Sequence, residues 1–404
     1  MIGKIQNENE LNTASGISID LIYLVSCAVC GVVPDKERIK KMDLSGLFRA
    51  AQFHLLSSVT CMALESAGAF EADNFLMAEE SMRQLAKDWK DKKNKAIRKN
   101  LLLDTERREL LAAMEREGIW YLPLKGIILK EFYPKAGMRQ MADNDILFDS
   151  KFQWRLKEIM ESRGFQTISI ARGNHDVYEK KPVYNYEMHT SLYGRVHDEA
   201  WAAYYSNVKE RLIKEDNSSY GYHFSDEDFY VYLITHACKH YNSGGTGIRS
   251  LLDIYVYLRK MESALDWNYI SGELQKLHVE DFEADSRRVA KKLFSQEVNE
   301  LNEREAELLR YFLGSGAYGT MKNRVGKKLH EYQQDGEPIK AGTKRRYLVG
   351  RLFPDEEFYQ NYAPFAYRHR WFRPIFIPFR VVRGVLRNGK KIVREFKMVV
   401  KIKE

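Results

Sequence analysis

Cysteine is scarce in this sequence, with four residues in a chain of 404. So few thiols cannot provide a disulfide framework for a chain of this size, so we expect a reducing compartment and a packed apolar core. Cys27 and Cys30 form a CxxC motif, but no second pair accompanies it. We therefore expect these two side chains to pack as small apolar groups rather than to bind zinc or act in redox chemistry.

Long apolar runs and export signals are missing as well. The longest apolar stretch, residues 21–33, has thirteen residues, whereas a membrane-spanning helix needs about 20. Asp20 and Asp35 flank this stretch and no basic segment precedes it, which argues against a signal peptide. These absences exclude a polytopic membrane protein and predict a cytoplasmic location.

The composition is that of a folded chain with a mild basic excess. Hydrophobic residues make up 44% and charged residues 30%, so there is enough apolar material for a buried core. The 64 Lys and Arg residues outnumber the 56 Asp and Glu residues, which gives a formal charge of +8. This excess favours anionic partners such as nucleotides, nucleic acid or lipid headgroups, without choosing among them.

The apolar periodicity predicts helices on both sides of a short α/β stretch. Helical spacing dominates residues 17–80, a basic helical segment follows at 83–99, and an amphipathic helix at 105–117 ends before Gly118. Strands and helices then alternate through residues 119–192. Five further helices are expected at 226–241, 248–260, 267–277, 284–295 and 302–313.

This order predicts an α+β protein in which a small mixed sheet is embedded between helical regions. We expect four parts along the chain. They are an N-terminal helical region (1–103), an α/β core (104–200), a helical domain (201–320) and a basic aromatic C-terminal tail (321–404).

Asp143 and Asp145 are the most informative pair of residues. On a strand, residues two apart share a face, so these carboxylates would lie side by side. Two adjacent carboxylates repel each other unless a cation neutralises them, and oxygen ligands suit Mg²⁺ or Mn²⁺. An exposed turn is the alternative, but the apolar residues 146–148 that follow favour a buried strand.

A second predicted strand supplies another acid. Residues 183–189 alternate so that Asn185, Glu187 and His189 share one face. If this strand lies beside the first, Glu187 completes a cluster of three carboxylates. Such a cluster suits a two-metal phosphoryl or nucleotidyl transfer.

Lys125 and Gly126 lie at a predicted turn from a strand into a helix. Glycine allows close approach of backbone to a phosphate, and Lys125 adds a positive charge. Arg139, four residues before Asp143, offers a planar fork for phosphate oxygens.

The ordered motifs resemble a known family. They are similar to the uncharacterised nucleotidyltransferase family of bacterial proteins, within the polymerase-β-type nucleotidyltransferase superfamily, over roughly residues 40–320. The matching residues are Leu124-Lys125-Gly126, Tyr133-Pro134, Arg139, Asp143-x-Asp145, Glu187-x-His189, His236, Lys239, His240, Arg249, Asp253 and Asp266-Trp267.

This resemblance implies a polymerase-β-like core with Asp143, Asp145 and Glu187 as catalytic metal ligands. It also implies that Lys125-Gly126 replaces the usual nucleotide-phosphate turn. His236 and His240 are four residues apart, a spacing that zinc sites use, but no third ligand is signalled. We expect both histidines, with His189, to contact the nucleotide.

The sequence therefore predicts a nucleotidyltransferase that depends on Mg²⁺ or Mn²⁺ and transfers a nucleoside monophosphate from a nucleoside triphosphate to a hydroxyl. The acceptor stays open among protein, RNA, sugar and small molecule. The alternative is a catalytically inactive binding protein of the same fold, which contacts nucleic acid or membrane through its basic tail.

The tail itself interleaves basic and aromatic side chains across residues 367–403. Three interpretations remain open at this point: docking onto the protein's own core, lying on an anionic membrane surface, or binding RNA through phosphate and stacking contacts.

Overall fold

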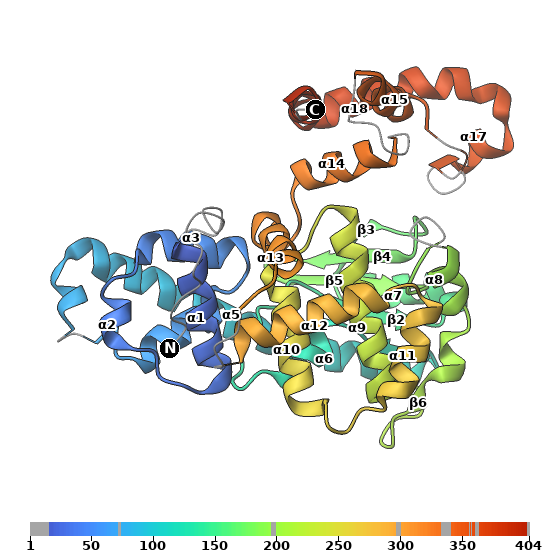
Figure 1. Ribbon diagram of the computed structural model, residues 1–404. Coiled ribbons are helices and arrows are strands. Elements are labelled where there is room, and N and C mark those ends of the chain that lie inside the picture. The colour runs from blue at the N-terminus through green and yellow to red at the C-terminus, as the bar shows by residue number, and fades with distance from the viewer. Residues whose placement is uncertain are drawn as a thin grey trace. The chain divides into compact units, whose positions relative to one another are not determined.

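The chain forms two compact units in the computed structural model (Figure 1). The described residues are 16–71, 74–194, 199–295, 300–332, 341–354, 356, 358–359 and 363–401. The first unit comprises the described residues up to Cys238 together with Thr246–Ala317, and the second comprises Lys239–Gly245 together with those from Tyr318 onward. Among the described residues of both units, no helix combines the length and the apolar character that a bilayer span requires.

Helices account for most of the first unit. They are α1 (Gly16–Cys30), α2 (Lys36–Ile39), α3 (Leu44–Phe53), α4 (Ser57–Ser66), α5 (Glu80–Arg116), α6 (Gly126–Leu129), α7 (Gln153–Ser162), α8 (Glu199–Tyr204), α9 (Asp226–Ser243), α10 (Ile248–Met261), α11 (Trp267–Lys276), α12 (Glu280–Phe294) and α13 (Glu303–Ser315). The last residues of α9 belong to the second unit.

Local signals explain where several of these helices begin. The Asp266 carboxylate accepts hydrogen bonds from the backbone N–H groups of Asn268 and Tyr269 at the start of α11. Asn302 and Glu305 form a reciprocal capping box at the start of α13. The five helices that the sequence predicts from residue 226 onward are confirmed, with shifted ends.

The first unit contains a five-stranded mixed sheet. Its strands are β1 (Tyr121–Pro123), β2 (Asn144–Phe148), β3 (Gln166–Ser169), β4 (His175–Lys180) and β5 (Tyr184–His189), in the order β1-β2-β5-β4-β3. Strands β2 and β5 are parallel, and the other neighbours are antiparallel. Strands β6 (Ile213–Lys214) and β7 (Tyr222–His223) pair separately. The predicted α+β fold class is confirmed.

One face of the five-stranded sheet packs on α5 and α7. Ile146 and Phe148 of β2 and Met188 of β5 share a buried cluster with Leu110 of α5 and Leu156 of α7. Because side chains alternate along a strand, the intervening residues of β2 and β5 face the opposite side of the sheet. That opposite side carries the predicted acidic residues.

The prediction of two separate helices at 83–99 and 105–117 is wrong, because α5 is one helix of 37 residues. Neither proline nor glycine interrupts the sequence between 80 and 117, and the helix stops before Gly118, which has a positive φ of 69°. The predicted boundary at 103/104 falls inside α5, whose Leu103 packs in the core of the sheet. The boundary at 320/321 lies close to Tyr318, where the second unit resumes.

The CxxC residues lie in α1 and are free thiols. Cys27 is buried, and the Cys30 thiol donates a hydrogen bond to the carbonyl of Phe294 at 3.2 Å. Both cysteines therefore lie within the helical part of the first unit, and their lack of a zinc or redox role stays a prediction.

The second unit consists of helices. They are α14 (Met321–Glu331), α15 (Ala341–Leu352), α17 (Pro364–Arg368) and α18 (Arg373–Lys401). Val325 and Leu329 of α14, Tyr347 of α15 and Val399 of α18 form a small buried cluster.

Candidate active site

Strands β2 and β5 bring two of the predicted acids together. The strands are parallel neighbours, with Asp145 opposite Glu187 and Leu147 opposite His189 in the register. Asp145 and His189 are buried, and Glu187 is half-buried. The expectation that the Glu187 strand lies beside the aspartate strand is therefore confirmed.

Asp145, Glu187 and His189 form a compact group of potential metal ligands. Each offers one ligand atom, and these atoms all lie within 4.8 Å of one another. The His189 Nε2 atom lies 3.0 Å from Asp145 Oδ1 and 3.7 Å from Glu187 Oε2. Two carboxylates and an imidazole fit a divalent cation. The buried Nδ1 atom of His189 has no hydrogen-bond partner among the described residues, so this nitrogen can still bind another group.

A lysine ammonium group lies beside the same carboxylates. Lys125 Nζ is 2.6 Å from Asp145 Oδ1 and 3.9 Å from Glu187 Oε2. The backbone of Lys125 has a φ of 49° and a ψ of −116°, a conformation that a side chain with a Cβ rarely adopts. Such conformations cost about 1–3 kcal/mol and concentrate at functional sites. The turn before α6 therefore holds Lys125 in a strained position beside the acids.

The pair of Asp145 and Lys125 is stabilised in its charged form. Burial would raise the pKa of Asp145, but the positive charge of Lys125 and the hydrogen bond from His189 hold it well below its usual range. Burial would lower the pKa of Lys125, but Asp145 and Glu187 raise it instead. The site thus contains one fixed carboxylate charge and one fixed ammonium charge.

The pKa values of Glu187 and His189 are shifted in the directions that favour their neutral forms. Burial and the charge of Asp145 raise the pKa of Glu187. Burial and the charge of Lys125 lower the pKa of His189 to about 4, so that its imidazole is neutral near pH 7. A neutral imidazole and a carboxylate of raised pKa are groups that can accept a proton.

Asp143 precedes β2 rather than starting it, and it lies outside the compact group of three ligands. It is close enough to Asp145 that burial and that neighbouring charge raise its pKa, against the opposing charges of Lys125, Arg249 and Lys99. The structure therefore brings Asp145, Glu187 and His189 into one cluster and places Asp143 at its side.

The segment that leads to Asp143 is held by hydrogen bonds from two helices. Lys99 Nζ donates to the carbonyl of Ala142 at 2.6 Å, and the Asn100 amide donates to that of Arg139 at 3.1 Å. Arg249 of α10 donates to the carbonyl of Gln140 at 3.3 Å. These contacts fix the backbone path between Arg139 and Asp143.

Asn144, between the two aspartates, ties β2 to α5. Its side-chain amide donates to the carbonyl of Leu103 at 3.2 Å, and its oxygen accepts from Arg107 Nη1 at 3.1 Å. Asn144 is fully buried, so both polar ends are satisfied within the core. An apolar residue here would leave the Leu103 carbonyl and Arg107 without these bonds.

The guanidinium group of Arg139 forms an ion pair with Asp253 of α10. Its Nε and Nη2 atoms donate to the two oxygens of Asp253 at 2.8 and 2.9 Å, and the Tyr133 hydroxyl donates to the same carboxylate at 2.7 Å. A Cβ atom on Gly126 would clash with the guanidinium of Arg139 and the sulfur of Met141. Glycine is therefore required at 126 because Arg139 packs against its backbone. A nucleotide-binding role for Arg139 stays a prediction.

The structure adds Tyr232 of α9 to this neighbourhood. Burial raises the pKa of Tyr232, and the charges of Asp145 and Glu187 contribute to the increase. His236 is half-buried one helical turn after Tyr232, and His240 is exposed near the end of α9. Neither histidine belongs to the compact ligand group found among the described residues, and their contact with nucleotide stays a prediction.

Sequence reasoning missed Tyr232 and Lys99 for different reasons. Tyr232 lies one turn before His236 on the predicted helix, and this spacing is the signal that could have found it. Lys99 belongs to the basic segment 83–99, where nothing in the sequence separates it from the solvent-exposed lysines.

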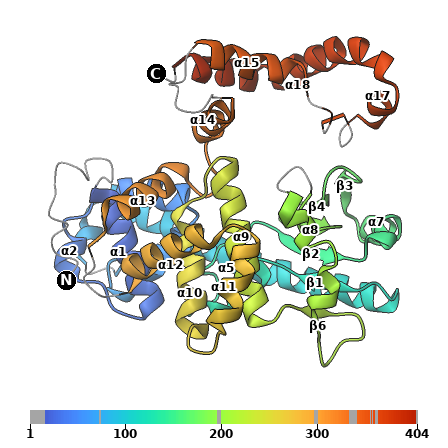
Figure 2. The same ribbon diagram turned by 45° about the vertical axis from the view of Figure 1, so that its right-hand side comes forward.

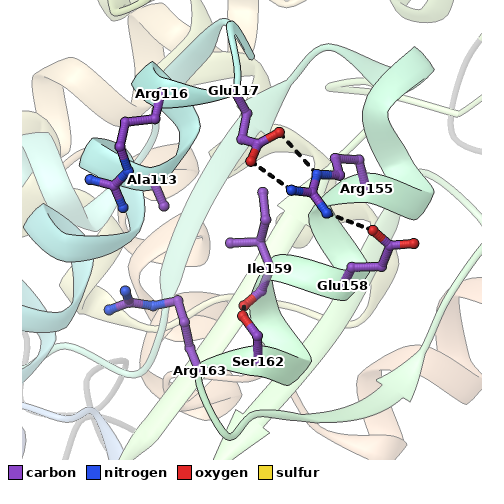
Figure 3. A pocket seen from close by; sticks show the side chains of 8 residues that line it. All are labelled: Ala113, Arg116, Glu117, Arg155, Glu158, Ile159, Ser162 and Arg163. Atoms are coloured by element: carbon purple, nitrogen blue, oxygen red, sulfur yellow. Dashed lines mark hydrogen bonds and ion pairs between the residues drawn. The ribbon is translucent and has the colours of Figure 1, made fainter.

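A surface hollow between α5 and α7 contains none of the candidate residues (Figure 3). The guanidinium of Arg155 in this hollow bonds to both oxygens of Glu117, at 2.7 and 2.9 Å, and to Glu158 at 2.7 Å. Because acidic side chains of the protein already engage it, Arg155 is not an open anion site.

Comparisons with known proteins place the chain in one family. No curated protein and no solved structure gave a significant match. The family model described as uncharacterised nucleotidyltransferase matches residues 40–295, which include the sheet, the turn at Lys125-Gly126 and helices α9 to α12. The chain therefore belongs to this uncharacterised nucleotidyltransferase family.

Proposed function

We propose that this protein transfers a nucleoside monophosphate from a nucleoside triphosphate to a hydroxyl acceptor, in a reaction that requires Mg²⁺ or Mn²⁺. The supporting observation is the convergence of Asp145, Glu187 and His189 from two adjacent parallel strands, with Lys125 Nζ 2.6 Å from Asp145. Family membership supports transferase chemistry in general.

The proposed reaction forms one bond and breaks another at the α-phosphorus. The acceptor oxygen bonds to the α-phosphorus, while the bond between that phosphorus and the oxygen that links it to the β-phosphorus breaks. The acceptor proton passes to the Glu187 carboxylate. Pyrophosphate leaves with the electron pair of the broken bond, so atoms and charge balance.

The residues around the cluster position and neutralise the triphosphate in this proposal. Lys125 provides an ammonium group for phosphate oxygens, and Gly126 lets the backbone approach closely. Arg139 maintains this turn through its packing on Gly126 and its ion pair with Asp253. His236 of α9 contributes to nucleotide contacts.

Asp143, Asp145 and Glu187 are the residues we propose as metal ligands, with His189 beside them. A bound divalent cation would supply positive charge to the phosphate oxygens during transfer. The acceptor class, whether protein, RNA, sugar or small molecule, depends on contacts beyond these residues.

The test is labelled-nucleotide transfer by the full chain in cell extract with Mg²⁺ or Mn²⁺. Asp145→Asn should abolish labelling and weaken Mn²⁺ binding measured by electron paramagnetic resonance. Asp91→Asn, at an exposed position of α5, is the matched control and should retain both. Circular dichroism establishes that each variant is folded. Transfer by Asp145→Asn at the wild-type level would contradict the proposal.

The position of Lys125 supports one alternative, a binding protein of the same fold without transfer activity. Its ammonium group already neutralises Asp145, as a metal ion would. Thermal unfolding with each of the four ribonucleoside triphosphates, with and without Mg²⁺, separates the two functions. Stabilisation that needs both nucleotide and metal supports the transferase. Indifference to every combination supports the alternative.

A further inference from the structure

Helix α18 belongs to the second unit (Figure 2), and several of its apolar side chains are exposed. The helix has 29 residues, and Asn388, with a φ of −133° and a ψ of 24°, divides it into two helical segments, 373–387 and 389–401. Each segment has to be considered by itself, because the change in backbone at Asn388 alters the direction of the faces.

We define the apolar stripe as seven exposed side chains that recur every three or four residues within each segment. They are Ile375, Phe379, Val382 and Leu386 in the first segment and Val393, Phe396 and Val400 in the second, and their exposed fractions run from 53% to 81%. Trp371, just before the helix, is 68% exposed. Exposed apolar side chains in such a row mark an interaction surface rather than scattered surface residues.

A basic stripe runs beside the apolar one. It consists of the exposed side chains of Arg383 and Arg387 in the first segment and of Lys390, Arg394 and Lys397 in the second, which recur every three or four residues within each segment. In total, α18 contains nine Lys and Arg residues and one glutamate, a formal charge of +8. This equals the formal charge of the whole chain, so the rest of the sequence is neutral on balance.

A third side of α18 makes the contacts within its own unit. Val399 is buried against α14 and α15. Glu395 accepts hydrogen bonds from the Tyr347 hydroxyl at 2.6 Å and from Arg351 Nε at 2.9 Å. The single acid of the helix is thus engaged inside the unit, and the described residues of the second unit leave the apolar and basic stripes exposed.

We propose that α18 binds the surface of an anionic lipid bilayer, lying parallel to the membrane plane. The apolar stripe enters the boundary between headgroups and acyl chains, and the basic stripe contacts the anionic headgroups. A helix with an apolar face and a cationic flank, but without the continuous apolar character that a bilayer span requires, fits this arrangement. Exposed Trp371 suits the headgroup level, where tryptophan concentrates in membrane proteins.

The chemistry of the stripes favours a bilayer over two other occupants. Most of the apolar stripe is aliphatic, and aliphatic side chains do not provide the stacking surfaces on which single-stranded RNA is held. A second copy of α18 would bring two basic stripes close together without acidic residues to pair them. An anionic lipid surface can bind both stripes, because its acyl chains accommodate apolar side chains and its headgroups attract basic ones.

The test is co-sedimentation of the full chain with phosphatidylcholine vesicles, with and without about one third phosphatidylglycerol. Binding should need phosphatidylglycerol and should weaken as salt increases. The double variant F379S/L386S should weaken binding at least tenfold, because two exposed apolar anchors are removed. The double variant R387E/K390E should weaken it by a similar factor through the loss of headgroup attraction.

Matched controls lie on α5 in the first unit. Leu101→Ser removes another exposed apolar side chain, and Lys92→Glu reverses another exposed charge. Both should bind vesicles as the wild type does. The proposal would be overturned if the wild type bound no vesicles, or bound neutral and anionic vesicles equally. It would also be overturned if both α18 variants bound vesicles as the wild type does. Finally, a wild type that forms a dimer but binds no vesicles, and that loses the dimer in F379S/L386S, would show that the apolar stripe binds a second copy instead. Preferred binding to a single-stranded RNA in competition with vesicles would also overturn the proposal.

Discussion

Asp145 and Glu187 lie opposite each other on the parallel strands β2 and β5, although 41 residues of sequence separate them. Parallel strands need a crossover connection, and here α7, β3 and β4 supply it. The register of this one strand pair fixes the distance between the carboxylates. Lys125 and His189 both form a hydrogen bond with the same Asp145 oxygen.

Lys125→Met should raise the affinity for Mn²⁺ in the absence of nucleotide by about tenfold, because the ammonium group competes with a cation for Asp145. Isothermal titration with Mn²⁺ measures this effect. Lys151→Met is the control, since it removes a lysine paired with Asp149 at 3.0 Å on the exposed surface. An affinity equal to that of the wild type would show that Lys125 does not compete with the cation.

Gly126→Ala should destabilise the fold by about 1–3 kcal/mol, because the new Cβ has to displace Arg139 or Met141. Urea unfolding followed by circular dichroism gives the free energy. Gly272→Ala in α11 is the matched control, because its Cβ meets no atom within 4 Å, and alanine favours the helix. A loss of stability in Gly272→Ala as large as in Gly126→Ala would argue against the packing explanation.

Asp253→Leu should cost about 3–5 kcal/mol of unfolding free energy, because it leaves the guanidinium of Arg139 buried without its carboxylate. The double variant Arg139→Met/Asp253→Leu should recover most of that loss, since apolar side chains replace the whole buried pair. The same urea experiment on the wild type, the single variants Asp253→Leu and Arg139→Met, and the double variant checks both statements. Additive losses would mean that the pair is not coupled.

His54 should make stability fall with acid. It is buried and burial lowers its pKa to about 4, below the ordinary 6.5. Between these values the unfolded chain takes up the proton and the folded chain does not, so the unfolding free energy decreases as the pH falls from 6.5 to 4. The decrease should be about 3 kcal/mol at most for this group.

The measurement for His54 is the unfolding free energy at several pH values between 4 and 6.5. His54→Gln should show a smaller decrease than the wild type over this range. His369→Gln, at an exposed position, should keep the wild-type dependence. An unchanged slope in His54→Gln would assign the acid sensitivity to other groups.

Much of the fold follows from short-range patterns in the sequence. The apolar run after Asp145 predicts β2, the alternation at 183–189 predicts β5, and Gly118 marks the end of α5. These predictions succeed because strand alternation and helix capping depend on neighbouring residues alone. The split of α5 fails because a change from basic to amphipathic character does not break a helix that contains no proline or glycine.

The sequence alone determined the residue types of the candidate site, the α+β class and the charge carried by the C-terminal helix. Only the tertiary structure decided that Asp253 binds Arg139 from 114 residues away, that Lys125 lies against Asp145, and which sides of α18 remain exposed. The physical reason is that each of these outcomes depends on strand register and helix packing between distant segments. No local pattern encodes which distant partner a buried charge will meet.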